Sequence, residues 1–315
     1  MPTLREYYNR LKQWQQKPFD YEFTTDELHH CNNCGHDFKG NYCPYCSQKA
    51  GEGPIGWDSV RQSVMDIWGL GSRSLSNTVR QLLLRPGYLI SDYISGKRQV
   101  SFPPVKMLFI VAVVVVFWVY YVLPLFLGDD FDVYGGSTSG FGGFEAWNKG
   151  HFVWTYFVLA IFYILPTWIM FRYAPRHTRH TLPQGFFIQI FLLILNLLVS
   201  FLALSPLIFW NYTIYLVASI VVLIIYYTIA YRQLFGYGTW GTLWRLLFVL
   251  GTVNYVIISF GAILFDFDPS MYGVGATSVN KYYFAGASAF WAVLSLLVGW
   301  GINLIVTRKA RKQLK

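Results

Sequence analysis

Six stretches of about 20 apolar residues follow residue 104, and they constrain the fold more than any other feature of the chain. A helix of this length crosses the hydrocarbon core of a bilayer, which is about 30 Å thick. We predict an all-α membrane protein whose transmembrane domain, residues 105–307, is a six-helix bundle. The third and fourth spans are separated by very few residues and are expected to form a tight hairpin. The spans lie at residues 105–127, 152–171, 186–210, 212–231, 243–265 and 286–307.

The basic residues indicate how this bundle lies in the membrane. With the N-terminus inside, the external segments hold two basic residues, Lys149 and Lys281, and the other 23 of 25 lie on the inner side or at its boundary. Lysine and arginine in short loops mark the cytoplasmic side. The first twenty residues also lack the apolar core of a secretory signal. We therefore predict a multi-pass protein with both termini in the cytoplasm.

The positions of the acidic residues indicate whether the bundle could be an ion-driven transporter. All sixteen Asp and Glu lie outside the predicted spans. Ion-coupled transporters usually place carboxylates near the membrane midplane, so this distribution argues against a carrier driven by protons or sodium. Arg245 lies near the cytoplasmic start of the fifth span, and we expect its side chain to extend to the lipid headgroups.

The four cysteines of the chain are arranged as Cys31-x2-Cys34-x8-Cys43-x2-Cys46. Two pairs with this spacing form turns that aim four thiolates at one ion, and a reducing cytoplasm favours metal over disulfides. We predict a structural zinc ribbon held by Cys31, Cys34, Cys43 and Cys46. An iron site of the rubredoxin type uses similar turns and stays open as an alternative. A glutaredoxin-like pair at Cys43 and Cys46 needs a βαβ frame, for which the flanking segments are too short.

The polar region before the spans divides into three predicted parts. An amphipathic N-terminal helix occupies 1–25, the zinc ribbon 26–52 and interfacial amphipathic helices 53–104, and a basic tail occupies 308–315. His29, His30 and His36 beside the cysteines are interpreted as surface residues. Five basic residues near the inner ends of the spans are predicted to contact lipid phosphate: Arg85, Lys97, Arg98, Arg176 and Arg179.

The paired cysteines, the segment RPGYLISDYISGKRQVSFPP and the multi-span body together resemble a bacterial family of membrane proteins of unknown function with an N-terminal zinc ribbon. The resemblance covers roughly the first 110 residues and implies a bacterial inner membrane, but no activity. Ser47 stands where a glycine often follows the last cysteine. The matching residues are Cys31, Cys34, Cys43, Cys46, Arg85, Pro86, Gly87, Tyr93, Gly96, Lys97, Arg98 and Pro104.

Small and polar residues recur on one face of several predicted spans. In the sixth span they include Ser295, Gly299 and Asn303, while the third carries Asn196 and the fifth Asn254. Such residues allow helices to approach closely or to hydrogen-bond across their interface. We predict that the third, fifth and sixth spans face one another, either as tight packing or around a polar cavity.

Prolines lie within two of the spans, and acidic residues recur in two external loops. Pro166 and Pro206 are expected to kink the second and third spans. The similar external sequences that begin at Asp130 and Asp266 each carry Asp-x-Asp, which suits either a divalent cation or a solvated loop.

These features favour a non-enzymatic function. We expect an integral membrane assembly, transport or scaffolding component whose ribbon docks a cytoplasmic protein partner and whose basic residues meet anionic headgroups. No nucleic acid is expected as a partner, and self-association stays open. The alternative is a passive conduit, or scramblase-like pathway, for lipid or a small solute. A membrane enzyme acting on lipid comes third, because no catalytic Ser/His/Asp set is recognisable.

Overall fold

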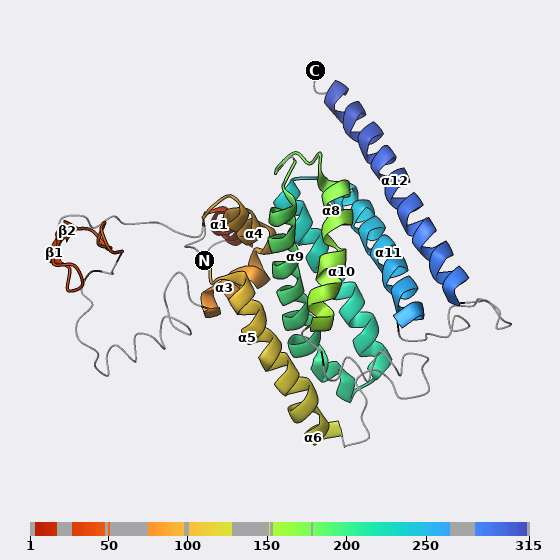
Figure 1. Cartoon of the computed structure of the whole chain (residues 1–315), viewed down its shortest axis with the longest axis horizontal. Coiled ribbons are helices and arrows are strands. Elements are labelled where there is room, and N and C mark those ends of the chain that lie inside the picture. Colours follow the sequence, from red (N-terminus) through yellow and green to blue (C-terminus); the bar gives the residue numbers. More distant parts are fainter. Residues whose placement is uncertain are drawn as a thin grey trace. The chain divides into compact units, whose positions relative to one another are not determined.

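The structure is a computed structural model that divides into two compact units, Met1–Asn77 and Thr78–Lys315 (Figure 1). It describes residues 4–17, 27–47, 50, 75–97, 101–127, 151, 154–177, 179–264 and 281–313. The predicted interfacial segment up to residue 74, Arg98 and both external Asp-x-Asp sequences lie outside these residues.

The described residues of the first unit include helix α1 and a small hairpin. Helix α1 (Leu4–Gln16) buries none of its residues, and its aromatic pair Tyr7 and Tyr8 is exposed. Strands β1 (Leu28–His30) and β2 (Asp37–Lys39) pair antiparallel, with His29 opposite Phe38. The buried residues around this hairpin are Cys31, Phe38 and Cys43, so two of the three are predicted metal ligands.

Among the described residues, five helices are long and apolar enough to span a membrane: Pro104–Leu127, Trp154–Phe171, Leu182–Phe209, Tyr212–Phe235 and Ala289–Arg308. They coincide with five of the six predicted spans, so the chain is a multi-pass membrane protein. The predicted fifth span corresponds to helix α11 (Thr239–Leu264), which has 26 residues but does not belong to these five. The count of six is therefore not confirmed.

The third span occupies the centre of the second unit. It consists of α9 (Leu182–Asn196), the π-helix η3 (Leu197–Ala203) and the 3-10 helix η4 (Ser205–Phe209), and 67% of its apolar window is buried, against 17–33% for the other four. Helix α5 (Pro104–Phe117) packs against α9 and η3. Helix α8 (Ile164–Phe171) contacts α9 and also α11 and α12 (Lys281–Gln313).

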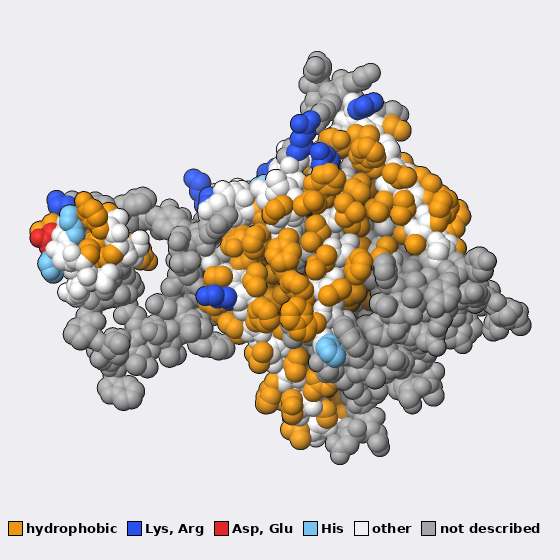
Figure 2. All heavy atoms as spheres, viewed as in Figure 1, with side chains coloured by type: hydrophobic (Ala, Val, Ile, Leu, Met, Phe, Trp, Pro, Cys, Tyr) orange, Lys and Arg blue, Asp and Glu red, His pale blue; other side chains and the backbone are white. Residues whose placement is uncertain are grey.

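The outward faces of the spans are apolar. Figure 2 shows hydrophobic side chains over most of the described surface of this unit in view, with lysine and arginine near one end. Exposed residues such as Val113, Val221 and Leu297 belong to these faces. Such a surface is suited to lipid acyl chains, because lipid tails are as apolar as the side chains themselves.

Helix ends explain where the spans stop. Thr181 forms a capping box with Gln184 at the start of α9, and the side chain of Asn211 caps α10 (Tyr212–Phe235). Gly236 ends α10 with a φ of 76°, a left-handed conformation that favours glycine. Asn211 and Trp210 are all that separates η4 from α10, as expected for a tight hairpin.

Two prolines mark irregular points in the spans. The second span is interrupted at Tyr163, three residues before Pro166, which has no amide to continue the helical ladder. Pro206 lies in the first turn of η4, directly after the π-helix. The first span is also irregular, since α5 continues through the π-helix η2 (Trp118–Val122) into α6 (Leu123–Leu127).

A helical corner precedes the first span. Helix α3 (Leu75–Leu84) ends before Arg85, and Pro86 occupies the first turn of α4 (Pro86–Ile94), where its missing amide costs no hydrogen bond. Helix α4 packs against α10 and α9. A Cβ on Gly87 would lie 2.1 Å from the carbonyl oxygen of Ala230, so this close approach requires glycine. The amide of Gly87 donates to Oε1 of Gln233 at 3.0 Å.

Candidate functional site

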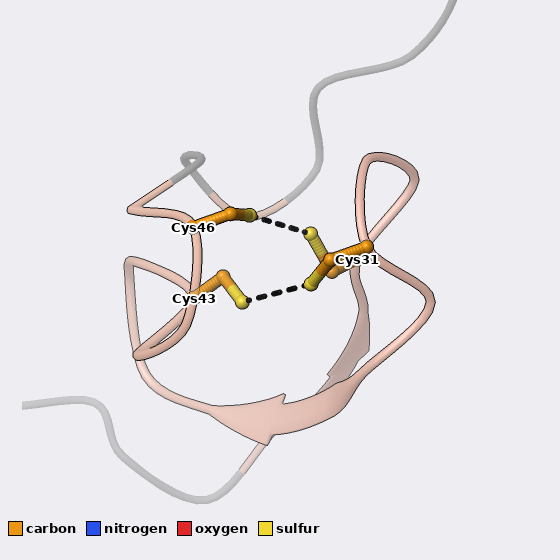
Figure 3. Close-up of side chains that lie close together, drawn as sticks. Cys31, Cys43 and Cys46 are labelled. Carbon is orange, nitrogen blue, oxygen red and sulfur yellow. Dashed lines mark hydrogen bonds between the residues drawn. The ribbon is translucent and has the colours of Figure 1, made fainter.

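The four cysteines meet at one point of the first unit, as their spacing predicts. Their sulfur atoms all lie within 4.8 Å of one another, with 3.4 Å between Cys31 and Cys46 and 3.5 Å between Cys34 and Cys43. Sulfurs at the corners of a tetrahedron around an ion about 2.3 Å away would be about 3.8 Å apart. The cluster is therefore close enough to bind one metal ion, and zinc and iron both accept four thiolates. Figure 3 shows the cysteines approaching from two opposed turns.

The two turns are built alike. The amide of Gly35 donates to the carbonyl of Cys31 at 2.8 Å, and the amide of Ser47 donates to the carbonyl of Cys43 at 2.9 Å. Both donors have left-handed backbones, with φ of 72° at Gly35 and 60° at Ser47. Ser47 therefore adopts the conformation for which glycine is usual, at the position where the resemblance places a glycine.

The side chains around the cluster define its electrostatics. Nδ1 of His30 lies 2.7 Å from a carboxylate oxygen of Asp37, and the ring of His36 packs edge-on against Tyr45. A backbone hydrogen bond at His36 lowers the pKa of the Cys34 thiol, but bonds with the other cysteines outweigh it and raise that pKa to about 12. Metal binding must therefore displace protons from the cluster, which makes affinity depend on pH.

The helical corner corrects one predicted lipid contact. Arg85 is fully buried, where its guanidinium donates to Asp92 and to Oε1 of Gln81, 3.3 Å away. It is thus an internal ion-pair residue and is not available to a headgroup. Lys97 is exposed and also donates to Asp92, at 3.3 Å. A buried arginine with a carboxylate partner holds the turn between α3 and α4.

The loop between the second and third spans faces this corner. Arg176 and Arg179 are exposed there, as expected for headgroup contacts. Ser91 Oγ lies 2.7 Å from Nε2 of His177, a pair 86 residues apart that no local sequence signal indicates. Within the described part of the chain, no carboxylate bonds the His177 ring, so a Ser/His/Asp set is not completed.

The same loop holds a buried histidine. His180 is 3% exposed, and neither ring nitrogen has a hydrogen-bond partner among the described residues. Burial, with further contributions from His177 and Arg172, lowers the pKa of His180 to about 4. Burial and Arg176 lower the pKa of His177 as well. Both rings are therefore neutral near pH 7.

Asn303, predicted to lie on a polar face, forms a buried link with Arg245. The Nε and Nη2 atoms of Arg245 donate to Oδ1 of Asn303 at 3.0 and 2.9 Å. The amide of Asn303 donates in turn to the carbonyl of Met170 at 2.9 Å. Arg245 is 2% exposed and stacks between Tyr237 and Trp244, so the expectation that it reaches the headgroups is wrong.

The other residues of the predicted polar face do not lie together. Ser295 donates to the carbonyl of Ala292 and lies 3.4 Å from the hydroxyl of Thr252 on α11, and a Cβ on Gly299 would meet the ring of Phe248 at 2.5 Å. Asn196 accepts from Ser200 on its own helix. Asn254 belongs to α11, but its side chain lies outside the described part. Helix α12 packs on α11, whereas α9 contacts α8, α5 and α4.

Comparison with known proteins adds one finding. A family model described as "Protein of unknown function (DUF3667)" matches residues 73–116, which cover α3, α4 and most of α5. The match includes the Arg85 corner and lies outside the cysteine cluster. No curated protein and no solved structure matches the chain.

Proposed function

We propose that the chain is an integral membrane component for assembly, transport or scaffolding, with a structural zinc ribbon that docks a cytoplasmic protein. The cysteine cluster carries this proposal. Four thiolates fill a tetrahedral coordination sphere, which leaves no position for a substrate or a reactive water. A closed site of this kind stabilises a surface, so the ribbon is best used for contact with a partner.

The membrane arrangement that we propose has six spans and lies in a bacterial inner membrane. Helix α11 has 26 residues and would be about 39 Å long, which is enough to cross a bilayer. Six spans return the C-terminus to the side of the N-terminus, in agreement with the distribution of lysine and arginine. Five spans would place the two ends on opposite sides.

A conduit is less well supported than a scaffold. Several of the described polar side chains inside the bundle are engaged with one another, as in the link between Arg245 and Asn303. Gln189 likewise donates to Thr167 at 3.1 Å and to the hydroxyl of Tyr231 at 3.2 Å. Groups committed to internal hydrogen bonds stabilise helix packing and offer little to a passing solute.

Partner dependence tests the function. The tagged full chain is cross-linked in its native membrane, and copurifying proteins are compared among the wild type, Cys31→Ser/Cys46→Ser and His36→Ala. We expect a partner in near-stoichiometric amount with the wild type and with His36→Ala, and its loss with the cysteine variant. Asn196→Leu/Asn254→Leu should retain it. A partner set unchanged by the cysteine substitutions would contradict the proposal.

Sidedness is tested separately. Every cysteine of the chain belongs to the ribbon, so a membrane-impermeant maleimide applied after metal chelation reports the side of the ribbon alone. We expect labelling only after the cells are permeabilised. A C-terminal reporter fusion should then lie on the same side, and a reporter on the opposite side would show an odd number of spans.

A further inference from the structure

A groove lies where the second and last spans end together. It has a volume of about 210 Å³ and is lined by Tyr173, Leu304, Thr307 and Arg308. The described part of the last span ends at Arg308, where the apolar sequence gives way to a run that includes Lys309, Arg311 and Lys312, and Tyr173 follows the end of the second span by two residues. The side-chain amide of Asn303 on α12 donates to the carbonyl of Met170 on α8, so these two helices lie side by side at this point. The groove is thus at the membrane boundary.

The lining combines hydrogen-bond donors with apolar surface. No hydrogen bond or ion pair of Arg308 or of the Tyr173 hydroxyl occurs among the described residues, so both are available as donors. Thr307 already donates its proton to the carbonyl of Asn303 at 2.6 Å. Neither residues 172–184 nor residues 282–315 contain an Asp or a Glu, whereas Arg172 and Arg176 flank Tyr173 in the sequence. The groove therefore suits an anion.

One face of α12 next to the groove is apolar, and we call the open space above Gly301 on this face the recess. Leu297, Gly301, Leu304 and Arg308 follow one another at intervals of four, three and four residues, so they share one helix face. A Cβ on Gly301 would meet no atom within 4 Å, and Leu297 beyond it is 58% exposed. This face leads from the arginine toward the middle of the span.

We propose that the groove binds a membrane phospholipid, with its phosphate against Arg308 and Tyr173 and an acyl chain along the recess over Gly301. The volume of about 210 Å³ fits one headgroup and is below the range of about 300–1,000 Å³ typical of pockets for whole small molecules. A soluble anion would use the arginine but would gain nothing from the apolar recess. The proposal rests on the five spans and is independent of the ribbon.

The test measures retention of phosphatidylglycerol by the delipidated full chain in detergent, using native mass spectrometry. Arg308→Gln is compared with Arg232→Gln, which removes an exposed arginine at the end of another span. Gly301→Leu fills the recess, and Gly251→Leu is its control because a Cβ there also meets no atom within 4 Å. Both leucine variants favour the helix, so loss of the fold is not expected.

We expect Arg308→Gln to weaken binding by about five-fold, as for the loss of one cation at a lipid headgroup, and Gly301→Leu to weaken it as well, with both controls unchanged. Equal losses for Arg308→Gln and Arg232→Gln would overturn the site, because they would show unspecific attraction. Inorganic phosphate is added at the concentration of phosphatidylglycerol as a competitor. If it displaces the lipid and Gly301→Leu has no effect on binding, the groove is a site for a free anion and the lipid assignment is overturned.

Discussion

The ribbon and the bundle differ in what fills their interiors. Among the described residues around the cysteines, Phe38 is the one buried apolar side chain besides Cys31 and Cys43, so hydrophobic burial there cannot offset the entropy of ordering the segment. In the bundle, large apolar side chains such as Leu89, Met107 and Phe191 are fully buried, and the helices satisfy their own backbone groups. We therefore expect metal binding to control the fold of the cysteine segment and to leave the bundle unaffected.

The largest effect is expected when the cysteine segment loses its metal. Metal removal, or Cys31→Ser/Cys46→Ser, should unfold residues 27–50, because binding of a structural zinc ion is worth about 10–16 kcal/mol in zinc-finger peptides. The thermal unfolding of the bundle should not change. Hydrogen exchange of the purified full chain measures both units at once, and metal analysis distinguishes zinc from iron. A bundle that loses protection together with the ribbon would contradict the comparison.

The second prediction concerns the polar link inside the bundle. Asn303→Leu removes the acceptor of Nε and Nη2 of Arg245 and leaves the buried guanidinium only the carbonyl of Gly241, 2.6 Å from Nη1, so we expect a loss of about 3 kcal/mol in the free energy of unfolding. Arg245→Leu/Asn303→Leu removes both partners and should recover part of that loss. Denaturation in detergent measures the pair. Equal stability of the wild type and Asn303→Leu would show that the contact contributes nothing, and equal stability of the single and double variants would contradict the expected recovery.

The third prediction is a dependence of the bundle on pH. The folded-state pKa of His180 is about 4, below its ordinary value of 6.5, so between these values the unfolded chain binds a proton that the folded chain does not. Stability is therefore complete above pH 6.5 and falls as pH decreases toward 4. Lowering the pH from 7.5 to 5.0 should cost about 2 kcal/mol.

His180→Leu serves as the control for this effect, since it cannot titrate. It should lose most of the pH dependence, with the remainder due to His177, whose pKa is also lowered. The measurement is denaturation of both proteins at the two pH values. An unchanged slope in His180→Leu would assign the dependence to other groups.

Features that depend on local spacing could be predicted from the sequence, and features that depend on tertiary contacts could not. Local spacing predicts the four-cysteine cluster and the positions of five spans, because both depend on residues close together in the chain. It misjudges Arg85 and Arg245, whose environments are set by burial and by contacts such as the one to Asn303, 58 residues away. The periodicity of the third span also does not show that α8, rather than α11 or α12, packs against it, because helix order is a property of tertiary packing.

The last prediction has the smallest effect and concerns the backbone conformation of Ser47, directly after Cys46. Ser47 has a left-handed backbone at the position matched by Gly35 in the other turn, and a side chain there costs roughly 1 kcal/mol. Ser47→Gly should therefore increase resistance to a competing chelator by a few-fold, while Ser47→Ala, which keeps the Cβ, should resemble the wild type. Gly35→Ala should weaken metal retention by a similar factor. We expect the bundle to be independent of the metal, so none of the three substitutions should alter its unfolding. A change there would show that the two units are energetically coupled.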